Sequence, residues 1–173
     1  TLTDADVVVF ALCEDPYSTG ENACISDIGI SDYEKSILRR AKALGKPLVG
    51  VFFYGRPIAM QGVAEWFDAI LYAWHGGCEV AHAAADILFG DRSPSGRTPV
   101  TFPRLATHLP LTYNSYPSGH EVHSYYGENL PACYRDSHAS PYYPFGYGLT
   151  YSEVRYAPPT CEPSVLSVSE LER

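Results

Sequence analysis

The chain has 173 residues, of which 46% are hydrophobic and 18% are charged, and its formal net charge is −8. This length suits about one domain with a proper core, and the composition is that of a globular protein rather than a disordered one. The negative charge argues against nucleic acid or an anionic membrane as a partner, and no apolar run approaches the roughly 20 residues of a membrane helix.

The first predicted strand is the continuous apolar run DVVVFAL at residues 6–12, bounded by acids. Such a run is typical of a strand that is covered on both faces. It leads into a loop rich in Pro, Gly and Ser, CEDPYSTGENA at residues 13–23, which carries Glu14 and Glu21. The loop therefore leaves the carboxyl end of a buried strand, where ligands bind in open α/β sheets.

A helix is predicted over residues 31–45, SDYEKSILRRAKALG. Ser31 and Glu34 form a capping box, Gly45 lies just past the end, and one face is apolar at Ile37, Leu38, Ala41 and Leu44. The next segment, KPLVGVFFYGRP at residues 46–57, predicts a second buried strand that ends in a polar loop at Gly55 and Arg56.

A shorter helix is predicted around GVAEWF at residues 62–67, followed by a third strand, AILYAW, at residues 69–74. HGGCEVAHAAADILFG then predicts a glycine-rich turn and an alanine-rich helix over residues 75–90. This alternation of strand and helix predicts an α/β fold, in which right-handed crossovers give a mostly parallel sheet flanked by helices on both faces, an α/β sandwich.

From Asp91 onward the chain is rich in Pro, Ser and Tyr, and predicts a long irregular wrap over the sheet with functional loops. The chain has 14 Tyr, many of them between residues 113 and 156. Tyr side chains stack on rings and donate hydrogen bonds, although ordinary loop packing is the alternative. Within PYYPFGYGLTY we expect Phe145 and Leu149 to be buried anchors, while Gly146 and Gly148 allow close backbone approach.

Polar and aromatic residues follow each predicted strand. Because the ends of parallel strands open onto one edge of a sheet, we expect these groups to share one cleft. Acids together with planar aromatic side chains suit a sugar, whose hydroxyls need hydrogen-bond partners and whose apolar face stacks on rings. The residues are Cys13, Glu14, Asp15 and Tyr17, then Tyr54, Gly55, Arg56 and Pro57, then Trp74, His75, Gly76 and Gly77.

Other chemistries find little support. The chain has no G-x-S-x-G elbow, no phosphate-binding G-x-x-x-x-G-K-[ST] loop and no G-x-G-x-x-G motif, so we expect no cofactor. A hydrolase of another class would need a Ser within hydrogen-bond reach of His75. His120 and His123, in HEVH, have the wrong spacing for a helical zinc motif, and five widely spaced Cys predict neither a disulfide framework nor a zinc site. We therefore expect no metal.

Two long motifs identify a family resemblance. The segments ILYAWHGGCEVAHAAADILFGDRSPSGRTPVTFPR and PYYPFGYGLTYSEVRY, with FFYGRPIAM, resemble the C-terminal α/β-sandwich domain of family 3 glycoside hydrolases, the β-glucosidase and β-xylosidase family. The resemblance assigns residues 1–156 to this domain. Residues 157–173 are similar to a linker and the start of the family's fibronectin-type-III-like domain. Since the chain also opens without a Met or a signal peptide, we expect a fragment of a larger protein.

The resemblance implies part of a retaining β-glycosidase, most simply a β-glucosidase. Its nucleophile, an Asp, would lie on a missing N-terminal (β/α)8 barrel, and this domain would supply the general acid/base. Glu14 matches the family's carboxylate after the first strand, and Glu21 matches a second acid of bacterial members, as an alternative acid/base or a substrate-binding group. Cys13 stands where the family usually has Gly, which would strain the loop by about 1 to 3 kcal/mol if φ is positive there.

Tyr17, Arg56, Trp74 and His75 are the expected substrate-binding residues. The implied partners are a β-linked oligosaccharide or glycoside and the barrel of the same protein, and the family resemblance suggests a secreted or periplasmic location. The isolated chain is predicted to be inactive because it lacks the nucleophile. The alternative function is a non-catalytic carbohydrate-binding or interdomain structural module.

Overall fold

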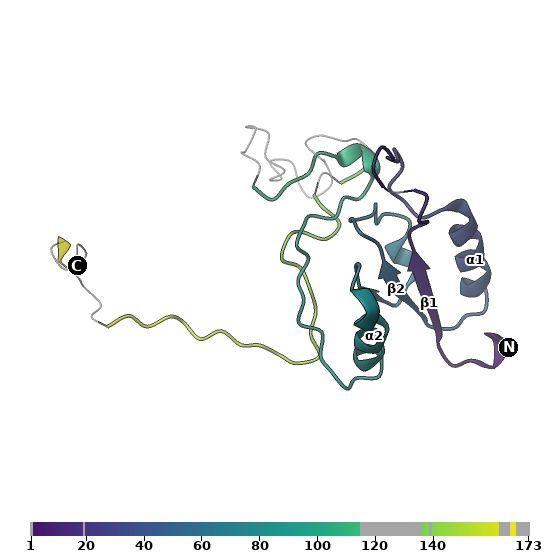
Figure 1. Ribbon diagram of the computed structural model, residues 1–173. Coiled ribbons are helices and arrows are strands. Elements are labelled where there is room, and N and C mark those ends of the chain that lie inside the picture. Colours follow the sequence, from purple (N-terminus) through teal and green to yellow (C-terminus); the bar gives the residue numbers. More distant parts are fainter. Residues whose placement is uncertain (1, 19, 115–135, 139, 163–166, 169–173) are drawn as a thin grey trace.

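Three parallel strands form the centre of the domain. In the computed structural model, which describes residues 2–18, 20–114, 136–138, 140–162 and 167–168, the strand order is β1-β2-β3. These strands are β1 (Val8–Cys13), β2 (Leu48–Phe53) and β3 (Ala69–Tyr72). β1 and β2 begin in register at Val8 and Leu48. The predicted α/β fold with a parallel sheet is confirmed (Figure 1).

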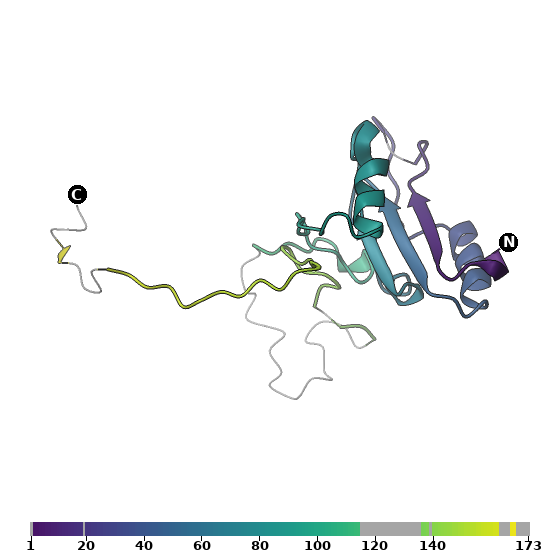
Figure 2. The ribbon, with the colours of Figure 1, turned by 90° about the horizontal axis from the view of Figure 1, so that it is seen from below.

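Two helices flank the sheet. The helix α1 (Asp32–Lys42) connects β1 to β2, and α2 (Val80–Leu88) follows β3. Figures 1 and 2 show the two helices on opposite sides of the strands, as the α/β sandwich requires. Four single 3-10 turns also lie in the described ranges, and the short helix predicted around residues 62–67 is only one of them. They are η1 (Leu2–Asp4), η2 (Ala64–Trp66), η3 (Gly77–Glu79) and η4 (Ala106–His108).

The start of α1 is fixed by the predicted capping box. The backbone N–H of Glu34 donates to Ser31 Oγ at 3.2 Å, and the backbone N–H of Ser31 donates to Glu34 Oε2 at 2.7 Å. The other carboxylate oxygen of Glu34 accepts a hydrogen bond from the hydroxyl of Tyr54 at 3.1 Å. Burial, and then the charge of Glu34, raise the pKa of Tyr54, so this hydroxyl stays a neutral donor. The cap thus ties α1 to the end of β2.

Ser31→Ala is expected to lower the free energy of unfolding by about 0.5 to 2 kcal/mol, because it removes the N-cap hydrogen bond. Urea unfolding followed by circular dichroism measures this loss. Ser36→Ala is the matched control, since Ser36 lies inside α1, where its hydroxyl bonds the carbonyl of Tyr33 and where alanine has the higher helix propensity. Equal losses in the two variants would contradict the capping role of Ser31.

Most of the core lies between the sheet and α1. The larger cluster of buried residues joins Leu38 of α1 to the sheet and to Phe102, and a smaller one contains Val8, Ala41 and Leu48. The opposite face is covered less completely. Ala84 is the buried residue of α2, while Val7 is 47% exposed and Val9 is 52% exposed. Because strand side chains alternate, Val9 points away from the α1 side. The described residues cover this face of β1 only in part, so the prediction of a strand covered on both faces is not met by them.

The chain after α2 wraps past the sheet and pairs with itself. Residues 98–102 lie beside residues 142–147, where the backbone N–H of Phe102 donates to the carbonyl of Tyr143 at 2.9 Å. The backbone N–H of Thr98 donates to the carbonyl of Tyr147 at 2.8 Å. Further along, the hydroxyl of Tyr151 donates to the carbonyl of Ile87 in α2 at 2.8 Å. This arrangement confirms the predicted wrap for residues 98–102 and 142–151.

The prediction that Phe145 and Leu149 are buried anchors is wrong. Phe145 is 44% exposed and Leu149 is 72% exposed. Segment 141–151 is attached mainly through its backbone pairing, and the ring of Phe145 stacks instead on Tyr113, with ring centroids 4.1 Å apart. The buried anchor is Phe102, which is 1% exposed and belongs to the partner segment. The expected close approach is confirmed at Gly148, where a Cβ would lie 2.7 Å from a backbone oxygen. It is wrong at Gly146, where a Cβ would meet nothing within 4 Å and the glycine instead serves a positive φ of +78°.

Residues 152–162 are exposed throughout and extend away from the sheet (Figure 1). The assignment of residues 157–173 to a linker and a further domain stays a prediction, since most of the apolar stretch at residues 164–171 lies outside the described residues. His120, His123 and Cys133 also lie outside them. Among the helices that the structure describes, none is long and apolar enough to span a membrane.

Candidate active site

The polar loops that follow the three strands meet at one edge of the sheet, as predicted. The backbone N–H of Glu14, just after β1, points to the carbonyl of Phe53 at 3.4 Å. The backbone N–H of Ala73, just after β3, donates to the carbonyl of Phe52 at 2.8 Å. Both contacts extend the parallel pairing past the strand ends, so the loops beginning at residues 14, 54 and 73 start side by side.

Glu14 and Arg56 form an ion pair between the first two of these loops. Arg56 Nη2 contacts Glu14 Oε1, and the exposed fraction of the Glu14 side chain is only 6%, against 26% for Arg56. Glu14 Oε1 and Arg56 Nε form no hydrogen bond with a described residue. A buried pair of this kind must be kept intact, because removal of one partner leaves the other charge buried without compensation.

Tyr72, the last residue of β3, connects the third strand to this pair. Its hydroxyl donates to the main-chain carbonyl of Arg56 at 2.5 Å. Burial, and then the negative charge of Glu14, raise the pKa of Tyr72, while Arg56 opposes the shift. The hydroxyl therefore remains a neutral donor over the physiological pH range. This role of Tyr72 was not identified from the sequence, because the residue lies inside an apolar run. The only available signal was a tyrosine hydroxyl close to the predicted end of a strand.

Trp74 adopts an unusual backbone conformation beside these residues. Its φ of +55° lies in the left-handed region, which is uncommon for a residue other than glycine. The indole packs against Tyr72 at 4.6 Å and Phe102 at 5.8 Å between ring centroids, and these contacts hold the conformation in place. Backbone strain of this kind clusters at functional sites.

His75 follows Trp74 and lies against Gly55. A Cβ placed on Gly55 would be 2.5 Å from His75 Nε2, so any other residue there would displace the imidazole from this position. The imidazole is otherwise exposed, and no serine among the described residues forms a hydrogen bond with it. Among the described residues, His75 therefore lacks the serine partner that a hydrolase of another class would need.

Glu21 lies at the tip of a tight turn in the loop after β1. The backbone N–H of Ala23 donates to the carbonyl of Gly20 at 3.1 Å and closes the turn. Gly20 and Asn22 have φ values of +147° and +64°, a left-handed geometry that glycine and asparagine tolerate best. Glu21 is exposed, so the turn presents its carboxylate to solvent.

The structure brings Glu14, Arg56, Trp74 and His75 to one edge of the sheet, but not Tyr17. Tyr17 is 94% exposed in a turn formed with Asp15, whose Oδ1 accepts from the Tyr17 backbone N–H at 2.9 Å. Cys13 ends β1 in extended conformation, paired with Phe53, and therefore carries no left-handed strain. Among the described residues, His, Cys, Asp and Glu side chains form no group of three that can hold a metal ion.

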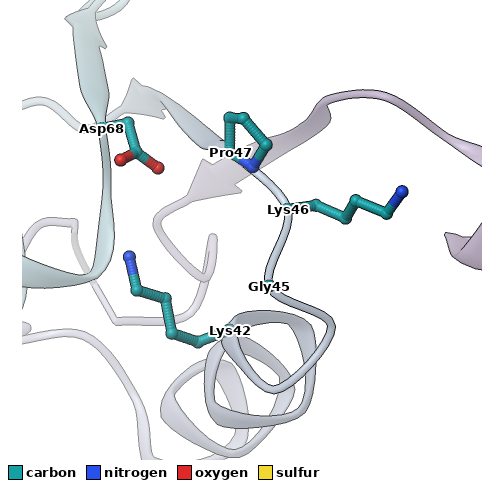
Figure 3. Close-up of a pocket in the computed structure, with 5 residues that line it drawn as sticks. All are labelled: Lys42, Gly45, Lys46, Pro47 and Asp68. Atoms are coloured by element: carbon teal, nitrogen blue, oxygen red, sulfur yellow. The ribbon is translucent and has the colours of Figure 1, made fainter.

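An open cavity of about 270 Å³ lies at the other edge of the sheet, where β2 begins (Figure 3). Asp68 Oδ2 accepts from the backbone N–H of Leu48 at 2.8 Å, and Lys42 Nζ donates to the carbonyl of Trp66 at 3.3 Å. The first contact links the residue before β3 to the start of β2, and the second links the end of α1 to η2, so these lining residues already have structural roles. Its lining residues are Lys42, Gly45, Lys46, Pro47 and Asp68.

Comparisons with known proteins agree with this architecture. The model of the glycosyl hydrolase family 3 C-terminal domain matches residues 1–151. A periplasmic beta-glucosidase of Salmonella typhimurium is 37% identical over 91% of this chain and 21% of its own length. A beta-xylosidase of Formosa agariphila is 31% identical over 90% of this chain and 21% of its own length.

Solved structures show the same fold. The crystal structure of a beta-glucosidase from Listeria innocua in complex with isofagomine superposes with a TM-score of 0.81 at 35% sequence identity. The match covers 88% of this chain and 21% of that protein. The chain therefore spans about one fifth of the length of the relatives that it matches.

Proposed function

The chain belongs to glycosyl hydrolase family 3, whose C-terminal domain it contains, and we propose that it forms part of a retaining β-glycosidase. A β-glucosidase is the first choice, because the Salmonella and Listeria relatives carry that name, and a β-xylosidase is the second because of the Formosa relative. The observation that carries the proposal is the convergence of carboxylate, guanidinium, indole and imidazole groups at the carboxyl edge of the sheet.

Retaining hydrolysis needs two carboxylates about 5 to 5.5 Å apart. One attacks the anomeric carbon and forms a covalent glycosyl intermediate. The other protonates the leaving oxygen and later removes a proton from the attacking water. We assign the nucleophile to an Asp on a barrel elsewhere in the same protein and the acid/base to the loop after β1 of this chain.

The geometry favours Glu21 over Glu14 as the acid/base. A general acid must come within hydrogen-bond distance of the glycosidic oxygen, about 2.6 to 3.2 Å. The Glu14 side chain is 6% exposed and is already bound by Arg56, whereas Glu21 is exposed at a turn. We therefore assign the acid/base role to Glu21, and Glu14, which matches the family loop in sequence, is the alternative.

The substrate would bind against the loops after β2 and β3. Trp74 offers a half-buried ring on which the apolar face of a sugar can stack, and His75 and Arg56 offer donors for its hydroxyls. The Arg56 side chain is 26% exposed, although its Nε is buried and forms no hydrogen bond with a described residue. Tyr17, at 94% exposed, would contact only a ligand or domain that approaches from outside the chain.

The partner proposed for this domain is the catalytic barrel and the rest of the same polypeptide. Two observations support further polypeptide beside the sheet. The relatives are about five times longer than this chain, and the apolar side chains of Val7 and Val9 are half exposed. Parallel sheets are normally buried on both faces, so these residues suit a covered surface.

The full-length protein is expected to hydrolyse aryl β-glucosides, while the 173-residue chain alone is expected to show no turnover, because it lacks the nucleophile. Release of the aryl alcohol by both proteins, on matched β-glucoside and β-xyloside substrates, measures this difference. Turnover by the isolated chain, or no hydrolysis of any β-glycoside by the full-length protein, would contradict the proposal.

A non-catalytic carbohydrate-binding or interdomain module is the second candidate. It is favoured by one observation, the burial of Glu14 against Arg56, which leaves the family-matching carboxylate little access to a substrate. In that case both Glu14→Gln and Glu21→Gln variants of the full-length protein would keep their turnover on substrates with poor leaving groups.

A further inference from the structure

We propose that Glu14, Arg56 and Tyr72 form a clamp that positions the loop carrying Glu21, so that Glu14 and Arg56 act as positioning residues. The inference rests on the proposed function, because it concerns how the acid/base of that function is held. In this scheme Glu14 acts through the loop and does not touch the glycosidic bond.

Arg56 is the centre of the clamp because it contacts both neighbouring strands. Its side chain binds Glu14 after β1, and its main-chain carbonyl accepts the hydroxyl of Tyr72 at 2.5 Å at the end of β3. The main-chain ladder weakens at this point. The contact from the backbone N–H of Glu14 to the carbonyl of Phe53 is 3.4 Å long, beyond the usual 2.7 to 3.2 Å. The side-chain contact between Arg56 and Glu14 therefore connects the loops where the main-chain hydrogen bonds between β1 and β2 end.

The loop beyond Glu14 has few other attachments. Its described hydrogen bonds are local. The backbone N–H of Ser18 donates to the carbonyl of Asp15 at 2.9 Å, and the backbone N–H of Ala23 donates to the carbonyl of Gly20 at 3.1 Å. The next long-range hydrogen bond among the described residues joins the carbonyl of Ile28 to the backbone N–H of Ala59 at 3.0 Å. The position of Glu21 therefore depends on the clamp at one end of the loop and on Ile28 at the other.

The burial of the pair also favours a positioning role. The Glu14 side chain is only 6% exposed, and taking charges out of water is costly. Apolar residues at the same positions would often stabilise a protein as well, so a buried ion pair is weak evidence for stability. The directed contact between Arg56 Nη2 and Glu14 Oε1 instead suits the proposed role of fixing how the two loops meet.

The test uses the full-length protein with the variants Glu14→Gln and Arg56→Lys and a series of aryl β-glucosides whose leaving groups differ in basicity. If the clamp positions the acid/base, kcat/KM should fall by roughly 10- to 100-fold on poor leaving groups, since a 1 Å misplacement can cost that much. The loss should be much smaller on good leaving groups, which need no proton. A loss that is equal for all leaving groups, or no loss, would overturn the clamp.

Two comparisons between variants keep the result interpretable. Arg56→Lys retains the charge, so it should fold even if Glu14→Gln does not, and thermal unfolding checks this. Glu153→Gln is the matched control, because the Glu153–Arg155 pair has N–O distances of 2.9 Å but lies exposed in the tail. This control should leave kcat/KM unchanged for every leaving group.

Failure of the clamp is distinguishable from failure of the proposed function. If Glu21→Gln loses turnover and added azide restores it, but the clamp variants show no selectivity for leaving groups, only the clamp is wrong. If Glu21→Gln keeps its turnover, the assignment of the acid/base is wrong. Azide rescue of Glu14→Gln would place Glu14 at the glycosidic bond and would overturn the clamp directly.

Discussion

Glu21→Gln in the full-length protein is expected to lower kcat by about 10² to 10⁴ on β-glycosides with poor leaving groups, the range that general acid catalysis contributes. The amide cannot donate the proton that such a leaving group needs. Glu21 lies exposed at the tip of its turn, so the substitution is expected to leave the fold of the domain unchanged. Steady-state kinetics over a series of aryl leaving groups measures the effect, which should shrink for groups that leave without a proton.

Glu162→Gln is the control for this experiment, since Glu162 is another exposed glutamate, in the extended tail. It should leave kcat and KM unchanged. If Glu21→Gln raises KM without lowering kcat, Glu21 only binds substrate and contributes equally to the ground state and the transition state. That result would return Glu14 to the first place as acid/base.

Phe102→Ala is expected to lower the free energy of unfolding by about 3 to 5 kcal/mol, the usual cost of a large cavity at a buried aromatic residue. Phe102 is 1% exposed and joins the C-terminal wrap to the sheet. Its ring centroid lies 4.9 Å from that of Tyr72, 5.8 Å from Trp74 and 6.1 Å from Tyr143. The substitution therefore removes packing under the candidate site as well as under the wrap.

Urea unfolding followed by tryptophan fluorescence measures this loss. Phe89→Ala is the matched control, because Phe89 is 85% exposed after the end of α2 and its removal leaves no buried cavity. Its expected change is within about 0.5 kcal/mol, as for other surface substitutions. Similar losses in the two variants would show that Phe102 is not an anchor of the core.

The strands and α1 were predictable because their signals are local. Apolar runs mark the three strands, and the capping box at Ser31 and Glu34 marks the start of α1, which begins at Asp32. The meeting of the three loops followed from the parallel direction of the strands. These features depend on short stretches of sequence and on general rules of chain topology.

The remaining features depend on contacts between distant segments. The burial of Glu14 against Arg56 and the left-handed backbone of Trp74 arise from how separate loops pack. The apolar character of Phe145 and Leu149 suggested burial, but the pairing of their segment with residues 98–102 leaves both side chains outside. Sequence alone does not fix which face of an irregular segment meets the core, because such segments lack a regular period.

Sodium azide gives the most direct test of Glu21 as the acid/base. With a substrate whose leaving group needs no proton, Glu21→Gln should accumulate a glycosyl intermediate, because water then lacks its general base. Azide attacks without a base, so it should restore turnover of Glu21→Gln and yield the β-glycosyl azide, whereas Glu14→Gln should show no such rescue. Azide rescue of Glu14→Gln with none for Glu21→Gln would contradict the assignment.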